Sequence, residues 1–231
     1  MIFNKFIQIA GISNREESEM VMDCGIDFLG FPLRLPVNKE DITEKDAGEI
    51  IKSLVPPKYG IVITYLNLAE DITEFCKDLG CLILQLHVPI ESVELQKLKL
   101  IFPELVVIKS LVTGKYSVSE LKNQIDNQSA FVDAFITDSY NPKTGATGAT
   151  GLTHDWKISK ELVQYSRKPV ILAWGLTPEN IYNAIITVKP AGVDSHTGVE
   201  NIAGEKNKEK VEKFYSEAMR AFNKLNIVEN T

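Results

Sequence analysis

A few histidines and aspartates are the side chains of this chain best placed to move protons. The chain has three histidines, His87, His154 and His196, and imidazole titrates near neutral pH. His87 and Asp138 each end an apolar run that is typical of a buried strand. Two interpretations are open for each: a group that shapes a reaction site, or a structural group, which for Asp138 is a cap of the loop that follows it. The histidines lack metal-ligand spacing, so no metal site is expected.

Composition excludes several classes of protein. The 25 basic and 31 acidic residues give a net charge of −6 without a block of like charge, which argues against a nucleic-acid partner. Cys24, Cys76 and Cys81 are an odd number in hydrophobic stretches and predict buried, reduced thiols. No signal peptide and no apolar run of about 18 residues is apparent, so we expect a cytoplasmic protein without a membrane partner.

Short apolar runs alternate with longer amphipathic ones along the whole chain. Nearly continuous hydrophobic runs are typical of parallel strands that are covered on both faces. The predicted strands are Phe6–Ala10, Asp27–Phe31, Gly60–Thr64, Leu82–His87, Val106–Leu111, Ala134–Asp138, Val170–Trp174 and Gly192–Asp194. The predicted helices are Glu16–Cys24, Glu44–Leu54, Ile72–Leu79, Ser92–Ile101, Ser117–Gln128, Ile158–Tyr165, Pro178–Val188 and Lys208–Leu225.

Eight strand–helix units in strict order predict the α/β class and a single (β/α)₈ TIM barrel. No linker interrupts the chain, so residues 1–231 are expected to form one domain. The alternative is an open doubly wound sheet. That fold usually has fewer units and a glycine-rich first turn, and no GxGxxG follows the first predicted strand.

Small residues dominate the segment Thr144–Gly151, which falls between the sixth predicted strand and the helix after it. In a barrel this loop lies on the C-terminal face, where active sites are found. Its length and its place after Asp138 favour a mobile cover over the site. A solvent-exposed linker without a role is the alternative.

Several motifs, in the right order, resemble those of the phosphoribosylanthranilate isomerase family of tryptophan biosynthesis. Gly11-Ile12-Ser13-Asn14 is similar to the end of the family's K-I-C-G-I-T, and Gln85-Leu86-His87 matches its Q-L-H. The segment 171–180 is close to I-L-A-G-G-L-T-P-E-N, and the segment 192–200 resembles G-V-D-V-S-S-G-V-E. Asp138, followed by the segment 148–156, resembles the family's Asp and G-G-T-G-K-T-F-D-W. The resemblance runs along almost the full length.

The resemblance implies an Amadori rearrangement of a phosphoribosylamine, without a cofactor. That reaction needs one group that protonates the ring oxygen and another that removes the C2′ proton. Asp138 matches the family's general acid. The family's base is the Cys of K-I-C-G, and Ala10 stands in its place. A methyl group cannot move a proton.

Further site residues follow from the resemblance. Arg34 falls where the family has an Arg that holds the substrate's carboxylate, a task that suits a guanidinium fork; a surface arginine is the alternative. The positions expected to bind substrate are Arg34, His87, His154 and Asp194, and those expected to bind phosphate are Trp174, Gly175, His196, Thr197 and Gly198.

The departures from the family pattern fall on predicted strand ends and loops. Gln8 and Leu152 replace lysines, His154 replaces a Phe, Trp174 replaces a Gly and His196 replaces a Ser. This distribution indicates a site rebuilt for another ligand, or one that has decayed. His154 or His196 could replace the base, bind an anion, or do neither.

Two hypotheses follow. The first is an isomerase-type enzyme that acts on a phosphorylated sugar-amine or a related anionic small molecule, as a monomer or homodimer. Asp138, Asp194 and the small-residue loop favour it. The second is a barrel that binds a ligand or partner and has lost catalysis, which Ala10 and Trp174 favour. The fold alone does not decide between them.

Overall fold

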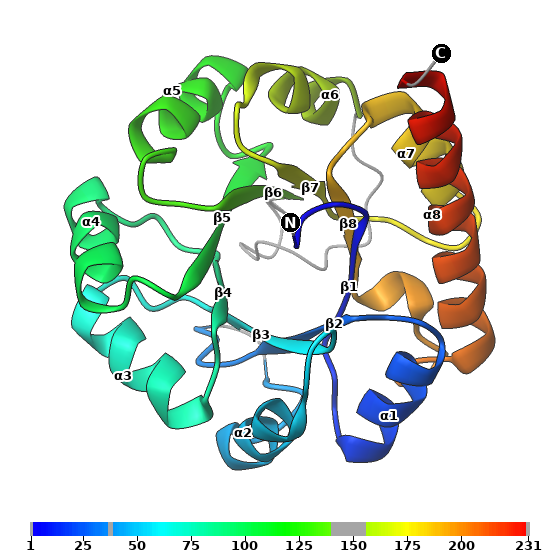
Figure 1. Cartoon of the computed structure of the whole chain (residues 1–231), viewed down its shortest axis with the longest axis horizontal. Coiled ribbons are helices and arrows are strands. Elements are labelled where there is room, and N and C mark those ends of the chain that lie inside the picture. The colour runs from blue at the N-terminus through cyan, green and yellow to red at the C-terminus, as the bar shows by residue number, and fades with distance from the viewer. Residues whose placement is uncertain (1, 37–38, 140–155, 230–231) are drawn as a thin grey trace.

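The computed structural model describes residues 2–36, 39–139 and 156–229. Within them, eight parallel strands close into a barrel in the order β1 to β8, and β8 pairs with β1. In Figure 1 the helices form a ring around these strands. Closure excludes the open doubly wound sheet and confirms the predicted (β/α)₈ barrel. The small-residue loop Thr144–Gly151 and His154 lie outside the described residues.

The elements follow the predicted alternation, with bounds that shift by a few residues. The strands are β1 (Phe6–Ala10), β2 (Phe28–Pro32), β3 (Tyr59–Thr64), β4 (Ile83–Leu86), β5 (Val106–Thr113), β6 (Ala134–Ser139), β7 (Val170–Leu172) and β8 (Gly192–Ser195). The helices are α1 (Arg15–Asp23), α2 (Glu44–Ser53), α3 (Ala69–Leu79), α4 (Ser92–Ile101), α5 (Val118–Gln128), α6 (Trp156–Tyr165), α7 (Ile181–Val188) and α8 (Lys208–Glu229), with the 3₁₀ helix η1 (Thr197–Val199) after β8.

The helices begin and end at residues whose chemistry suits those positions. Asn14 caps α1 by accepting the backbone N–H of Glu17, and Ser117 and Glu120 form a capping box at α5. Gly80 ends α3 at φ 69°, a left-handed conformation that glycine adopts without strain. No helix of the described residues is long and apolar enough to cross a membrane.

Two separate sets of apolar side chains pack on the two faces of the barrel wall. One fills the interior and includes Phe6, Phe28, Ile108 and Ile171, while a larger one packs the outer face of the strands against the helices. Side chains alternate between the faces along each strand. Gln8 and Ala10 of β1 therefore face inward, and the register places Gln8 beside Asp194 and Ala10 beside Gly30.

The seam between the first and last units is also joined by side chains. The Glu17 carboxylate of α1 accepts hydrogen bonds from the backbone N–H groups of Ser13 and Lys206, each at 2.7 Å. Lys206 lies 189 residues after Glu17 in the chain. His196, just after β8, lies against Gly11, where any added Cβ would come within 2.0 Å of its Nε2. Segments from both ends of the barrel sequence thus hold each other in place.

Candidate functional site

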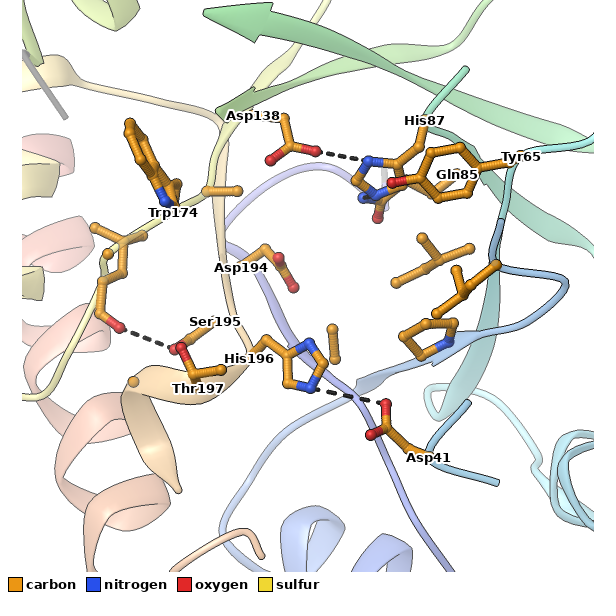
Figure 2. Close-up of a pocket in the computed structure, with 18 of the residues that line it drawn as sticks. Asp41, Tyr65, Gln85, His87, Asp138, Trp174, Asp194, Ser195, His196 and Thr197 are labelled. Carbon is orange, nitrogen blue, oxygen red and sulfur yellow. Dashed lines mark hydrogen bonds and ion pairs between the residues drawn. The ribbon is translucent and has the colours of Figure 1, made fainter. Parts of the chain in front are cut away.

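A cavity of about 200 Å³ opens at the C-terminal ends of the strands. Ala10, Asp138, Asp194 and His196 line it together with residues from the other strands and their loops (Figure 2). Barrel enzymes have their active sites on this face. The structure therefore brings residues that were predicted separately into one pocket. The further lining residues are Pro32, Leu35, Lys39, Asp41, Ile63, Tyr65, Gln85, His87, Ala173, Trp174, Gly175, Leu176, Ser195, Thr197 and Gly198.

Asp138 and His87 form a close polar pair on one wall of this pocket. His87 Nδ1 lies 2.6 Å from Asp138 Oδ2, and both side chains are largely buried. His87 Nε2 is 2.9 Å from Gln85 Nε2, and Gln8 Nε2 donates to Gln85 Oε1 at 3.1 Å. A polar chain thus crosses the barrel interior from β1 to β6. It fixes the orientation of the imidazole and holds the Asp138 carboxyl group at the pocket wall.

Asp194 projects from the end of β8 toward the centre of the pocket (Figure 2). Its side chain is buried, and within the described residues its Oδ1 has no hydrogen-bond partner. Burial, together with the negative charge of Asp138, raises the pKa of Asp194 to about 8, against a smaller opposing effect of the Lys206 ammonium. A carboxyl group with this proton affinity exchanges protons near neutral pH.

Ala10 lies on the wall between these groups and offers no titratable atom. The β-carbon of Ala10 is 2.9 Å from where a Cβ at Gly30 would lie, so glycine at 30 leaves room for the side chain at 10. Position 10 therefore lines the pocket, and its side chain is inert.

Trp174 and Gly175 form the turn after β7, on the pocket rim. Both have positive φ values, 84° and 61°. For tryptophan this backbone conformation is strained, whereas glycine adopts it freely. In Figure 2 the indole extends away from Asp194, so it does not fill the centre of the pocket. Asn180 fixes the same turn, because its side-chain amide donates to the Gly175 carbonyl at 2.7 Å.

The turn after β8 packs directly on the turn after β7. Ser195 Oγ donates to the Leu176 carbonyl at 2.9 Å. A Cβ at Gly198 would lie only 1.8 Å from that same carbonyl oxygen, so glycine is required there. Thr197 and Gly198 begin the short helix η1 at the pocket edge. The two predicted phosphate-binding turns therefore form one continuous edge of the pocket.

His196 sits among charged groups at the β8 edge. Its Nε2 is 3.3 Å from Glu200 and 3.8 Å from Asp41. Burial and the nearby Lys206 ammonium lower the pKa of His196 to about 3, so the imidazole is neutral. The Lys206 ammonium is itself buried and bonded to Glu200 at 2.5 Å. His196 is thus held as a neutral hydrogen-bonding group next to acidic side chains.

Arg34 is not among the residues that line the pocket. Its guanidinium pairs with Glu44 at 2.8 Å and stacks over the Phe75 ring at 3.8 Å. These contacts hold the cation on the outer surface of the loop after β2. A role of Arg34 in carboxylate binding stays a prediction, as does any role of His154.

The structure adds lining residues that sequence reasoning missed: Lys39, Asp41, Tyr65 and Gln85. Gln85 had a signal in the sequence, because it lies two residues before His87 and so faces the same side of the strand. Tyr65 follows β3 directly, and its ring stacks on His87 with centroids 5.5 Å apart. Lys39 and Asp41 lie in a loop without a pattern that predicts their position. No cluster of potential metal ligands occurs among the described residues.

Comparison with known proteins agrees with this geometry. The profile of a family described as N-(5′-phosphoribosyl)anthranilate (PRA) isomerase matches residues 8–217. The chain belongs to this family. N-(5′-phosphoribosyl)anthranilate isomerase 2 of Methanosarcina mazei is 34% identical over 221 residues, which cover 95% of this chain and 96% of that protein. The enzyme of the same name from Haloferax volcanii is 29% identical and covers 93% of each chain.

Solved structures of the phosphoribosylanthranilate isomerase family have the same barrel. The enzyme from Pyrococcus furiosus superposes with a TM-score of 0.75 at 26% identity, covering 94% of this chain and all of that one. The enzyme from Thermotoga maritima gives a TM-score of 0.77 at 25% identity, with 94% and 99% covered. The family assignment that the motifs implied is confirmed.

Proposed function

We propose that this protein is an isomerase that converts a phosphorylated sugar-amine into the corresponding aminoketose, with a substrate whose amine part differs from anthranilate. One observation carries the proposal: Asp138, bound to His87, and Asp194 face one pocket of a barrel that belongs to the phosphoribosylanthranilate isomerase family. Such a pair of titratable carboxyl groups suits a reaction that protonates a ring oxygen and removes a carbon-bound proton.

The two glycine-containing turns support binding of a phosphorylated substrate. Gly175 and Gly198 allow the backbone to approach an anion, and barrels commonly bind phosphate at the turns after the seventh and eighth strands. The indole of Trp174 leaves the pocket centre open. Lys39, which also lines the pocket, adds a positive charge to it.

The position of Arg34 supports a changed amine substituent. Its guanidinium is engaged by Glu44 and by the Phe75 ring, and it does not line the pocket. A substrate with a carboxylate at this end would have to draw the guanidinium from both contacts. Asp41 and Glu200, which lie beside His196, disfavour an anionic group in addition to the phosphate there.

A barrel that binds a ligand without catalysis is the second candidate. The observation that favours it is the inert side chain of Ala10, which lines the pocket where relatives have their base. The two candidates differ in whether any sugar-amine is turned over.

Isomerisation assays separate them. Purified protein is incubated with the ribosylamine 5-phosphates of anthranilate, 2-aminobenzamide and aniline, and products are resolved by chromatography with mass detection. We expect turnover of an uncharged arylamine. We expect phosphoribosylanthranilate to react at least about 10²–10⁴-fold more slowly than with a cysteine-bearing relative, the range that a positioned base contributes. Asp138→Asn is the inactive control. Absence of turnover with every substrate contradicts the proposal and supports the non-catalytic barrel.

A further inference from the structure

The proposed reaction requires a proton acceptor that position 10 does not supply. The carboxyl and imidazole groups that line the described pocket occupy three places. His87 and Asp138 bind each other on the β4–β6 side. Asp41 and His196 lie at the β8 edge, where the half-buried imidazole, with its lowered pKa, is a poor proton acceptor. Between them, Asp194 faces the pocket centre (Figure 2).

Asp194 comes from the strand next to Ala10. In the register of β1 and β8 it pairs with Gln8, and Ala10 is the next residue of β1 to face the same interior. The Asp194 carboxyl therefore lies on the side of the pocket that has lost the base. Asp138, on β6, lies on another wall. A substrate held between the two aspartates has one carboxyl group on each side.

The Asp194 carboxyl is also poised for proton transfer. The side chain is only 9% exposed, and within the described residues its Oδ1 has no hydrogen-bond partner. A buried acceptor without a partner loses its hydrogen bonds to water, so this position is poor for stability alone. An unpartnered oxygen that faces a cavity is available to a ligand in that cavity.

We propose that Asp194 is the general base of this enzyme and takes the proton from C2 of the sugar, in place of the family's cysteine. This inference rests on the proposed function and deepens it. Asp138, on β6 and paired with His87, supplies the acid.

The proton balance closes with these two carboxyl groups. Protonated Asp138 gives its proton to the ring oxygen as the C1–O bond breaks, and the nitrogen lone pair forms a C=N⁺ bond. Ionised Asp194 takes the C2 proton. The electron pair of the C2–H bond forms the C1=C2 double bond, and the π electrons of the C=N⁺ bond return to nitrogen. The enol then loses its O2 proton to Asp138 and gains a proton on C1 from Asp194, which gives the ketose and restores both groups.

The charges around Asp194 suit this role. Burial is the largest cause of the raised pKa of Asp194, about 8, and it makes the carboxylate a stronger base than an ordinary aspartate. The negative charge of Asp138 adds to this effect, against Lys206, only while Asp138 is ionised. About a tenth of Asp194 is ionised at pH 7 in the free enzyme. The positive charge of the C=N⁺ intermediate favours the ionised form of Asp194 at the step in which Asp194 takes the C2 proton.

The pH dependence of turnover tests this assignment. With the best sugar-amine substrate, kcat/KM of the wild type is expected to change with pH through an apparent pKa near 8, because the reaction needs a proton on Asp138 and none on Asp194. Asp194→Asn is expected to lower kcat by about 10²–10⁴-fold and to remove that pH dependence. Asp194→Ala is expected to regain activity with added formate, whose carboxylate can occupy the vacated space. Asp23→Asn, an exposed aspartate at the end of α1, is the matched control.

The outcomes distinguish this inference from the proposed function. A wild type whose activity does not change with pH near 8, or an Asp194→Asn enzyme that keeps near wild-type kcat, overturns the base assignment and leaves the isomerase intact. A wild type that is inactive with every sugar-amine overturns both. The wild-type profile and formate rescue do not depend on the fold of Asp194→Asn, which circular dichroism checks separately.

Discussion

At position 194 the environment changes the chemistry of an ordinary side chain. An aspartate in water is ionised at neutral pH, but a buried one beside a second carboxylate keeps its proton. The raised pKa means that the folded protein holds a proton that the unfolded chain releases above its ordinary pKa of 3.8. At neutral pH, folding therefore requires Asp194 to take up a proton, which lowers the stability of the folded protein.

This linkage predicts a pH-dependent stability difference between wild type and Asp194→Asn. Because the folded pKa is raised, the contribution of Asp194 to stability is full below about pH 4 and is lost as the pH rises to about 8. Relative to Asp194→Asn, the wild type should lose about 1–4 kcal/mol of unfolding free energy between pH 5 and 8. Urea unfolding at both pH values measures it. Parallel pH dependences of the two proteins would contradict the raised pKa.

Ala10 allows a second prediction at the same scale. Ala10→Cys places a thiol on the pocket wall, but Gln8 binds Gln85 where relatives have a lysine, and Arg34 is held by Glu44. The restored thiol base thus lacks its usual surroundings. We expect kcat/KM for phosphoribosylanthranilate to rise less than about tenfold, small against the contribution of a positioned base. A gain of several hundredfold in the same kinetic assay would show that position 10 alone limits the reaction.

At the scale of elements, the turns after β7 and β8 act as one unit. Ser195 and the required glycine at 198 fasten the second turn to the Leu176 carbonyl of the first. Trp174 carries the largest side chain of this edge, and its backbone is left-handed. The question at this edge is whether an indole on the rim still permits an anion to reach the turns.

We expect the wild type to bind ribose 5-phosphate at this edge, because Gly175 and Gly198 keep the backbone accessible and the indole points away from Asp194. Trp174→Gly should bind with similar affinity. Calorimetric titration of both proteins with phosphate and ribose 5-phosphate measures this. Binding that appears only in Trp174→Gly would mean that the indole closes the anion site.

The strands were predictable because each is a nearly continuous apolar run between polar segments. The first residues of the helices were less predictable. Helix α7 begins at Ile181 and not at Pro178, because Thr177 to Asn180 form a separate hydrogen-bonded turn. The sequence pattern with its family resemblance singled out Asp138 and Asp194, since both end a strand. It did not predict the close contact between His87 and Asp138. Nor did it predict that Arg34 pairs with Glu44 and stacks on Phe75. These contacts depend on the three-dimensional packing of loops and strands.

At the scale of the whole molecule, the barrel brings together groups that are far apart in the chain. Ala10 and Asp194 line one pocket although 184 residues separate them, because β1 and β8 are neighbours. Such non-local pairing slows folding, since a long loop must close before the contacts form. It also means that Asp194, the proposed base, lies beside Ala10 only when the barrel is closed.

The seam between β1 and β8 has a consequence for synthesis on the ribosome. Glu17 and Gly11 are made early, but the backbone N–H of Lys206 and the imidazole of His196 that complete their surroundings emerge near the end. A nascent chain that stops before β8, at residue 192, leaves β1 as an open sheet edge, which is prone to pair with other chains. Stalled chains should therefore bind chaperones or be cut by protease near α1 until the last strand has been released.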